Sequence, residues 1–164
     1  MVYSVCILTV SDKATLGKRE DQTGPLLKQL VVPLRGNVLQ YQIVPDEKEK
    51  IKKALLLFCD QWNADLVLTT GGTGVSPRDV TPDATREIID REIPGFGEVM
   101  RMSGFSKNPK VVISRAMAGV RGKTLIINFP GSVRAVQENF ALLLPLLPHT
   151  LDKIRGDETD CVLV

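Results

Sequence analysis

Three glycines near the middle of the chain follow an apolar run and precede an aspartate, an order that suits phosphate chemistry. They are Gly71, Gly72 and Gly74, in the segment LVLTTGGTGVSPRDVTPDATREII that begins at residue 66. Glycine tolerates positive φ angles, so neighbouring amides can turn toward one anion, and the start of a following helix adds partial positive charge. The segment lacks the GK[ST] ending of a Walker loop, and Pro77 stands where a dinucleotide-binding motif has its third glycine. A phosphate-binding loop is therefore a hypothesis, with an ordinary tight turn as its alternative.

Asp79 lies just beyond these glycines, where a carboxylate would repel a bound phosphate unless a cation lay between them. Mg²⁺ commonly bridges carboxylate and phosphate oxygens, so the pattern favours a nucleotide bound with magnesium. An Asx-type turn within PRDV is the alternative for Asp79, and Asp83 suits the first turn of a helix. Asp46, in VPDE, has Glu49 three residues later, which is the spacing of a capping box. From the residues alone, we favour a helix cap for Asp46.

Other predicted strands also end in polar or glycine-containing turns. Ser11 and Asp12 follow the first predicted strand, Pro45 and Asp46 follow the second, and the turn 130–132 (Pro130, Gly131 and Ser132) follows the last. The carboxyl ends of parallel strands share one edge of a sheet, where α/β folds bind their ligands. We therefore expect these turns to form one site with the glycines, although Ser132 also suits a helix cap.

Arg115 lies among small residues in the segment SRAMAG. Its guanidinium is either free to meet a phosphate or part of a surface ion pair, and the residues leave both interpretations open.

Apolar runs with strand character alternate with segments of helical period. Strands are predicted over 5–10, 38–44, 65–70 and 124–129, and helices over 25–32, 45–62, 81–92, 95–105 and 131–156. We expect Thr81 to cap the third of these helices, Pro145 and Pro148 to divide the last, and a short strand to begin at Lys110. The alternation predicts a three-layer α/β fold with a mostly parallel sheet and helices on both faces. Residues 1–156 are expected to form one domain, followed by a tail over 157–164.

The composition is that of an ordinary globular protein and argues against several classes of site and partner. Of 164 residues, 43% are hydrophobic and 24% charged, and the net charge of +2 indicates neither a nucleic-acid nor a membrane partner. The longest apolar run, ALLLPLLP, is far shorter than a membrane span. A single histidine, His149, argues against a histidine metal site or a Ser–His triad. Three cysteines without CxxC spacing predict reduced thiols and a cytoplasmic protein.

The glycine segment, together with LTVSD, VPDE, PGFGEVMR and SRAMAGVRGKTLIINFPGS, resembles the molybdopterin adenylyltransferase family. That family includes the bacterial MogA proteins and the G domains of gephyrin and the plant Cnx proteins. The resemblance runs from residue 5 to about residue 154. It implies a three-layer α/β domain, usually a homotrimer, that transfers AMP from Mg-ATP to the terminal phosphate of molybdopterin and releases pyrophosphate. It also implies that the product passes to a MoeA-type protein, which inserts molybdate.

The resemblance assigns roles to particular residues. The family's two essential aspartates fall on Asp46 and Asp79, which would be catalytic and would hold Mg²⁺; this reverses our preference for Asp46 as a cap. The residues implied to bind nucleotide phosphates are Ser11, Asp12, Gly71, Gly72, Thr73 and Gly74. Those implied to bind molybdopterin or adenylate are Ser114, Arg115, Asn128, Pro130, Gly131 and Ser132. Thr23 replaces a serine in the family's D-x-S-G segment, which leaves the role of that hydroxyl open.

AMP transfer is not the only function compatible with this resemblance. The alternative is a non-catalytic or MoaB-type module that binds molybdopterin or nucleotide, or a scaffold like the gephyrin G domain. PGFGEVMR resembles the MogA branch, and a lone domain of this size argues against scaffolding.

Overall fold

A six-stranded sheet forms the middle layer of the computed structural model, which describes residues 1–158. Its strands are β1 (Tyr3–Val10), β2 (Gly36–Val44), β3 (Leu66–Thr70), β4 (Arg91–Glu92), β5 (Ala118–Arg121) and β6 (Thr124–Phe129). In space they follow the order β2-β1-β3-β6-β5-β4; the first four are parallel, and β5 and β4 pair antiparallel. The predicted mostly parallel α/β fold is confirmed, with an antiparallel edge added. Of the predicted tail, residues 159–164 lie outside the described part of the chain.

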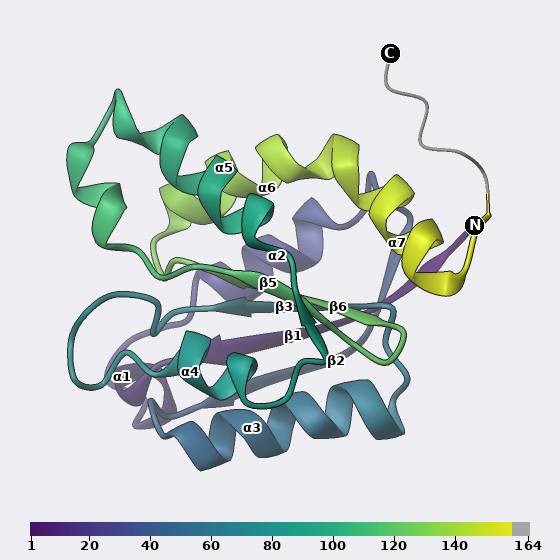
Figure 1. Cartoon of the computed structure of the whole chain (residues 1–164). Helices are drawn as coiled ribbons and strands as arrows, with labels where there is room; N and C mark the ends of the chain where they lie inside the picture. Colours follow the sequence, from purple (N-terminus) through teal and green to yellow (C-terminus); the bar gives the residue numbers. More distant parts are fainter. Residues whose placement is uncertain (159–164) are drawn as a thin grey trace.

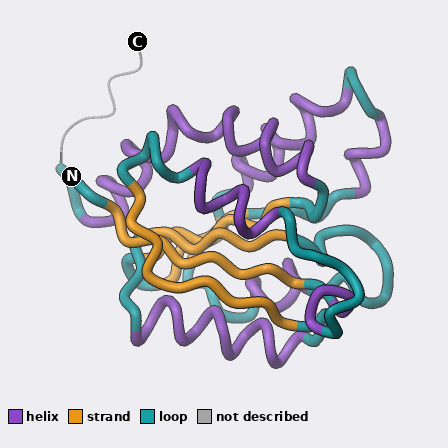
Figure 2. The backbone as a smooth tube through the Cα atoms, turned by 180° about the vertical axis from the view of Figure 1, so that it is seen from behind, coloured by secondary structure: helices purple, strands orange, loops and turns teal. Residues whose placement is uncertain are grey.

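Helices cover both faces of this sheet (Figures 1 and 2). One face carries α2 (Thr23–Leu30), α5 (Pro94–Phe105), α6 (Val133–Leu143) and α7 (Leu147–Arg155), and the other carries α3 (Lys48–Leu56) and α4 (Thr81–Arg86). A short helix, α1 (Asp12–Thr15), follows β1. Within residues 1–158, no helix is both long enough and apolar enough to cross a membrane.

The central strand β1 is apolar along its whole length because both of its faces are covered. Val5 and Ile7 pack with the layer that contains α2 and α6, whereas Cys6 and Leu8 pack with the layer that contains α3. All four side chains are fully buried. Side chains alternate between the faces of a strand, so a strand buried on both sides reads as one continuous apolar run. The four predicted strands are confirmed, although β2, at the edge of the sheet, is mostly half-buried or exposed.

The strand expected at Lys110 is wrong, because Pro109–Ile113 forms a 3₁₀ helix, η2. The side chain of Asn108 caps this turn by accepting the N–H of Lys110 at 3.2 Å. The strand forms later, as β5, where the backbone at Gly119 approaches its neighbours closely: a Cβ there would lie 2.6 Å from the side chain of Ile89. Small residues therefore mark the strand in this segment.

Two predicted helices end or begin differently from expectation. The helix predicted over 81–92 ends at Arg86, because β4 pairs with β5 and the N–H of Asp90 donates to the carbonyl of Val120 at 2.8 Å. The helix predicted over 45–62 begins at Lys48 and continues as a π-helical turn, η1 (Leu57–Gln61). Neither Asp46 nor Thr81 caps a helix, so both cap predictions are wrong.

The long C-terminal helix is divided as its prolines predict. A 3₁₀ turn, η3 (Leu144–Leu146), separates α6 from α7. Pro145 and Pro148 each lack the amide hydrogen that an uninterrupted helix needs.

Candidate functional site

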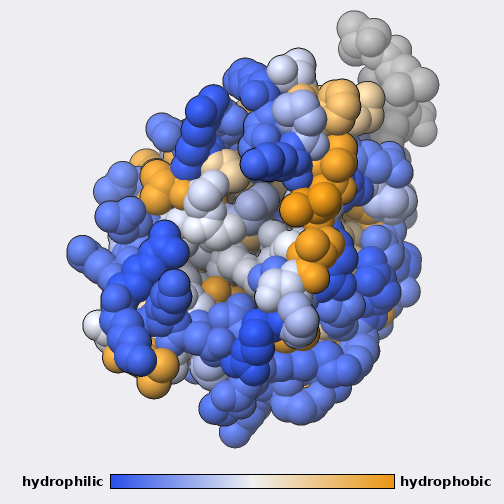
Figure 3. All heavy atoms as spheres, turned by 90° about the vertical axis from the view of Figure 1, so that its left-hand side faces the viewer, coloured by the Kyte–Doolittle hydropathy of each residue, from blue (hydrophilic) through white to orange (hydrophobic). Residues whose placement is uncertain are grey.

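The turns that follow β1, β2, β3 and β6 meet at the carboxyl edge of the sheet. A cavity of about 190 Å³ lies there, and its lining includes Ser11, Asp46, Gly71 and Gly131 from these four turns. Figure 3 views this side of the molecule and shows a hollow with residues of intermediate hydropathy, surrounded by hydrophilic and hydrophobic atoms. The expected convergence of the four turns is therefore confirmed.

The backbone of the glycine loop (residues 71–80) turns its carbonyls into the protein. All four carbonyls of residues 71–74 accept hydrogen bonds at 2.7–3.1 Å, two from Thr81 and two from Arg115. Gly71 and Gly72 have φ angles of 99° and 64°. Within the described part of the chain, the amides of residues 72–74 donate to no acceptor. Amide groups of this kind are free to bind an anion, so the geometry fits a phosphate-binding loop.

Glycine is required where the loop meets the turn that follows β6. A Cβ on Gly71 would lie 2.2 Å from the carbonyl oxygen of Val10, and one on Gly131 would lie 3.2 Å from the Cα of Gly71. The hydroxyl of Thr70 also donates to the carbonyl of Pro130 at 3.1 Å. The two glycine turns thus pack backbone against backbone.

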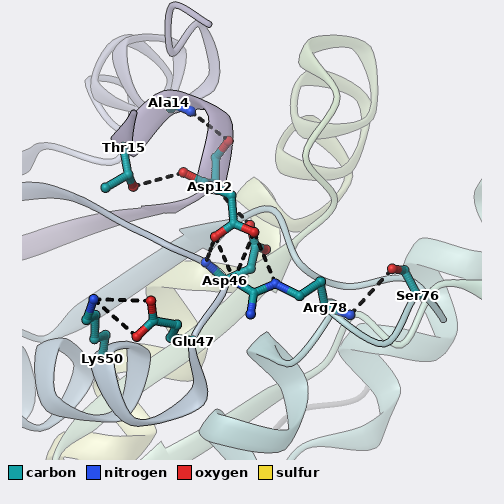
Figure 4. Close-up of polar contacts among 9 residues, drawn as sticks. Asp12, Ala14, Thr15, Asp46, Glu47, Lys50, Ser76 and Arg78 are labelled. Carbon is teal, nitrogen blue, oxygen red and sulfur yellow. Dashed lines mark hydrogen bonds and ion pairs between the residues drawn. The ribbon is translucent and has the colours of Figure 1, made fainter. Parts of the chain in front are cut away.

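Asp12 and Asp46 hold one another through reciprocal hydrogen bonds (Figure 4). The N–H of Asp12 donates to Oδ2 of Asp46 at 2.8 Å, and the N–H of Asp46 donates to Oδ1 of Asp12 at 3.0 Å. Burial raises the pKa of Asp46, and the negative charges of Asp12 and Asp79 raise it further, against the bond from Asp12 and the charge of Arg78. We call Asp12, Asp46 and Asp79, which come from the turns after β1, β2 and β3, the acid cluster.

Asp79 also closes its own loop. Its Oδ2 accepts the N–H of Ser76, three residues earlier, at 2.9 Å. The Asx-type turn offered as the alternative for this residue does not form, because the N–H of Thr81, two residues later, donates to the carbonyl of Gly72. Among residues 1–158, no group of three or more His, Cys, Asp or Glu side chains converges closely enough to hold a metal ion. Mg²⁺, however, is usually bound by one or two carboxylates together with substrate phosphates. The hard oxygen donors of Asp46 and Asp79 fit an ion bound in that way.

Arg115 is not free, and the expectation of an unpaired guanidinium is wrong. Its Nη1 donates to both carboxylate oxygens of Asp83 at 2.9 Å, which bears out the ion-pair alternative. Its Nε donates to the carbonyl of Gly74 at 2.8 Å, and Nη2 donates to the carbonyl of Asp79. Arg115 thereby fixes two carbonyls of the glycine loop, and its charge is already paired with that of Asp83.

Asn128 is fully buried, which contradicts its expected place in a ligand site. Its Nδ2 donates to the hydroxyls of Thr69 and Thr85 at 3.0 Å, and its Oδ1 has no partner among the described residues. The residue ties α4 to the sheet beneath the site. The side chain of Thr73 is also buried, so only its backbone could meet a nucleotide.

A second cavity, of about 220 Å³, lies on the other side of the turn after β6. Ser114, Pro130 and Ser132 line it, together with Arg101 and Lys110. Ser132 caps α6 by accepting the N–H of residue 135 at 3.2 Å, as its cap interpretation predicts. Seven of the predicted site residues thus line one of two cavities that share a turn. The other seven line neither of these two cavities: Asp12, Gly72, Thr73, Gly74, Asp79, Arg115 and Asn128.

Asp21 is a lining residue of the first cavity that our sequence analysis missed. Its carboxylate accepts the hydroxyls of Thr9 and Tyr41 at 2.6 and 2.5 Å, the hydroxyl and N–H of Thr23, and the N–H of Gly24. Burial alone would raise the pKa of Asp21, but these hydrogen bonds hold it below its usual range. The sequence signal that could have identified Asp21 is the D-x-T-G spacing, because the hydroxyl of Thr23 donates to the carboxylate of Asp21.

Known proteins share this chain's sequence and fold. A family described as a probable molybdopterin binding domain matches residues 6–149. The molybdopterin adenylyltransferase of Helicobacter pylori J99 is 40% identical over 153 residues, which cover 92% of this chain and 87% of that protein. The molybdopterin biosynthesis enzyme MoaB of Thermus thermophilus is 47% identical with a TM-score of 0.90, covering 95% of this chain and 98% of that one. The Mog protein of Mycobacterium ulcerans is 34% identical with a TM-score of 0.89, covering 96% and 99%.

Replacing Gly71 by alanine should destabilise the protein more than the same change at Gly122. Both glycines have positive φ, but only at Gly71 would the added Cβ meet a backbone atom. We expect a loss of about 1 kcal/mol for Gly122→Ala from conformational strain, and of about 3 kcal/mol for Gly71→Ala from strain plus the clash with Val10. Urea unfolding measures both, and equal losses would contradict the close approach of Gly71 to the carbonyl of Val10.

Asp21→Asn should destabilise the protein at neutral pH by about 2 kcal/mol, because charged hydrogen bonds are lost. The folded protein lowers the pKa of Asp21 below its ordinary 3.8. The stabilisation is therefore complete above that value and is lost as the pH falls through the lower pKa of the folded state. The difference in unfolding free energy between the two proteins should shrink below about pH 4. Glu20→Gln, at the exposed neighbour, is the control, and a pH-independent difference would contradict the assignment.

Proposed function

Because this chain belongs to the probable molybdopterin binding domain family, we propose that it adenylylates molybdopterin. In the proposed reaction, AMP passes from Mg-ATP to the terminal phosphate of molybdopterin, and pyrophosphate leaves. The observation that carries this proposal is the meeting of four turns at one cavity on the carboxyl edge of the sheet, where Asp46 and Gly71 line the wall and the free amides of residues 72–74 follow Gly71 in the chain. The relative from Helicobacter pylori, whose name states this activity, supports it.

We assign the free amides of residues 72–74 to the phosphates of the nucleotide. Their carbonyls are held from behind, so the N–H groups need no rearrangement to meet an anion. Donors fixed in advance stabilise developing charge without a cost of reorganisation. Ser11 and Asp12 border the same position from the turn after β1.

Asp46 and Asp79 are the residues that would hold Mg²⁺ beside the nucleotide. When bound, the ion would neutralise negative charge on the phosphates. Asp12 fixes the position of Asp46 through the two reciprocal hydrogen bonds, and Ser76 fixes one oxygen of Asp79. Both carboxylates are therefore positioned by backbone groups before any ligand arrives.

The transfer needs no nucleophilic side chain. An oxygen of the terminal phosphate of molybdopterin forms a bond to the α-phosphorus of ATP, and the bond from that phosphorus to the bridging oxygen breaks, so pyrophosphate leaves with the electron pair. The protein lowers the barrier by positioning both substrates and by stabilising their charge. We place molybdopterin or the adenylate in the second cavity, where Ser114 and Ser132 supply hydroxyls and Arg101 and Lys110 positive charge.

A MoaB-type binding module is the second candidate function. The 47% identity with the Thermus MoaB favours the MoaB branch, since that identity exceeds the 40% shared with the Helicobacter enzyme, and the Thermus protein is itself named as an enzyme. Formation of adenylylated molybdopterin distinguishes the two, because a module that only binds would release no pyrophosphate.

The proposed product would pass to a MoeA-type protein that inserts molybdate, and we place both steps in the cytoplasm. The free and buried thiols of Cys6 and Cys59 support a reducing compartment. Adding such a protein and molybdate to the assay should consume the adenylylated product, and its persistence would contradict this order of steps.

We propose that the chain forms a homotrimer through an apolar patch on α5 and η2. The patch consists of exposed side chains of Val99, Met102, Phe105, Val112 and Ile113. Light scattering should give three times the chain mass of 18.0 kDa, and Phe105→Asp should reduce it. Val32→Asp, at an exposed residue after α2, is the control. A wild-type protein with the mass of one chain would contradict the trimer.

Asp79→Asn should abolish AMP transfer while leaving the fold intact. The amide keeps an oxygen for the N–H of Ser76 but loses the charge, so turnover should fall by on the order of 100-fold or more. The assay incubates the protein with molybdopterin, ATP and Mg²⁺ and follows adenylylated product and pyrophosphate. Asp60→Asn, which leaves the site untouched and alters a pair with Arg121, should retain turnover. Unchanged turnover in Asp79→Asn would remove that residue from the site.

A further inference from the structure

Arg78 links the glycine loop to the acid cluster through a single exposed ion pair. Its Nε and Nη2 donate to the carboxylate of Asp12 at 2.8–3.1 Å. The side chains of Arg78 and Asp12 are 57% and 39% exposed. In Figure 4, Arg78 extends from the glycine loop toward Asp12, and Asp46 lies beside that carboxylate. This pair spans the turns after β1 and β3, on the same edge of the sheet as the first cavity.

Arg115 and Arg78, the two arginines that bond within or beside the glycine loop, differ in the number of their contacts and in their exposure. Arg115 contacts two loop carbonyls and both oxygens of Asp83. Arg78 bonds one carboxylate through its side chain and is more exposed. Exposed ion pairs contribute little net stability, so the Arg78 contact is the one that opens readily.

The charge at this position favours a second cation. The guanidinium of Arg78 pairs directly with Asp12, and the carboxylate of Asp46 lies beside that pair, bonded to the N–H of Asp12. A guanidinium stays charged at every relevant pH, so the pair is not opened by deprotonation. A divalent cation would compete with it, because the two positive charges repel at short range.

We propose that Arg78 is a counter-ion of the acid cluster. When a divalent cation enters, Arg78 releases Asp12 and is then free to contact the phosphates of the nucleotide. This inference rests on the proposed function, because it concerns the metal and nucleotide of that reaction. In the absence of nucleotide, Arg78 weakens metal binding. Once released, Arg78 increases the affinity for the nucleotide. Because coupling between two binding sites is reciprocal, the metal and the nucleotide then strengthen each other's binding.

The test measures Mn²⁺ binding to the nucleotide-free protein, with the metal alone as the probe. Arg78→Gln should bind Mn²⁺ more tightly than wild type, on the order of tenfold, because a competing charge is removed. Arg78→Lys keeps the charge without the planar fork and should lie between the two. Arg86→Gln is the matched control, since Arg86 pairs with Glu92 at 54% and 40% exposure. It should match wild type.

A second titration contains a non-hydrolysable ATP analogue. The analogue should increase Mn²⁺ affinity in wild type more than in Arg78→Gln, because the variant has lost the group that couples the two ligands. Mn²⁺ affinity in Arg78→Gln that equals or falls below that of wild type would overturn the proposal, and so would equal coupling in the two proteins.

Failure of this proposal can be told from failure of the proposed function. AMP transfer by wild type with unchanged Mn²⁺ binding in Arg78→Gln would overturn the role of Arg78 alone. Tighter Mn²⁺ binding in the variant, without AMP transfer by wild type, would support the counter-ion and overturn the reaction.

Discussion

The arrangement of the candidate site depends on how the carbonyl groups of residues 71–74 are held. In a peptide unit the C=O and N–H point in opposite directions, so fixing the carbonyls inward leaves the amides directed outward. Thr81 and Arg115 provide those bonds, and Asp83 holds Arg115 in place. Backbone geometry thus leaves the amides of residues 72–74 without an acceptor among the described residues.

A buried chain of hydrogen bonds supports this loop from the sheet. Asn128 on β6 donates to the hydroxyl of Thr85, which donates to the carbonyl of Thr81, whose hydroxyl donates to the carbonyl of Gly71. Each link is buried, where hydrogen bonds are strong and an unmade bond is costly. Asn128 is therefore best understood as an anchor for the loop.

The sequence predicted the parts of the fold that depend on local patterns. Strands buried on both faces appear as apolar runs, and the prolines at 145 and 148 divided the last helix as expected. The two-residue strand at Arg91 carries no apolar signal, because its pairing with β5 alone defines it. The convergence of four turns could be foreseen, because parallel strands end at the same edge of a sheet. The partners of Arg115 and Asp46 could not be foreseen. Asp83 and Asp12 come from other parts of the chain, and no local spacing points to them.

The turn Pro130–Gly131–Ser132 separates the two cavities with a wall that is one turn thick. Gly131 faces the first cavity, while its two neighbours line the second. Gly131 also packs against Gly71, so the turn between the cavities is in direct contact with the backbone of the glycine loop. Tightly packed groups transmit displacement instead of absorbing it. A ligand that displaces this turn from one side would therefore also move a wall of the other cavity.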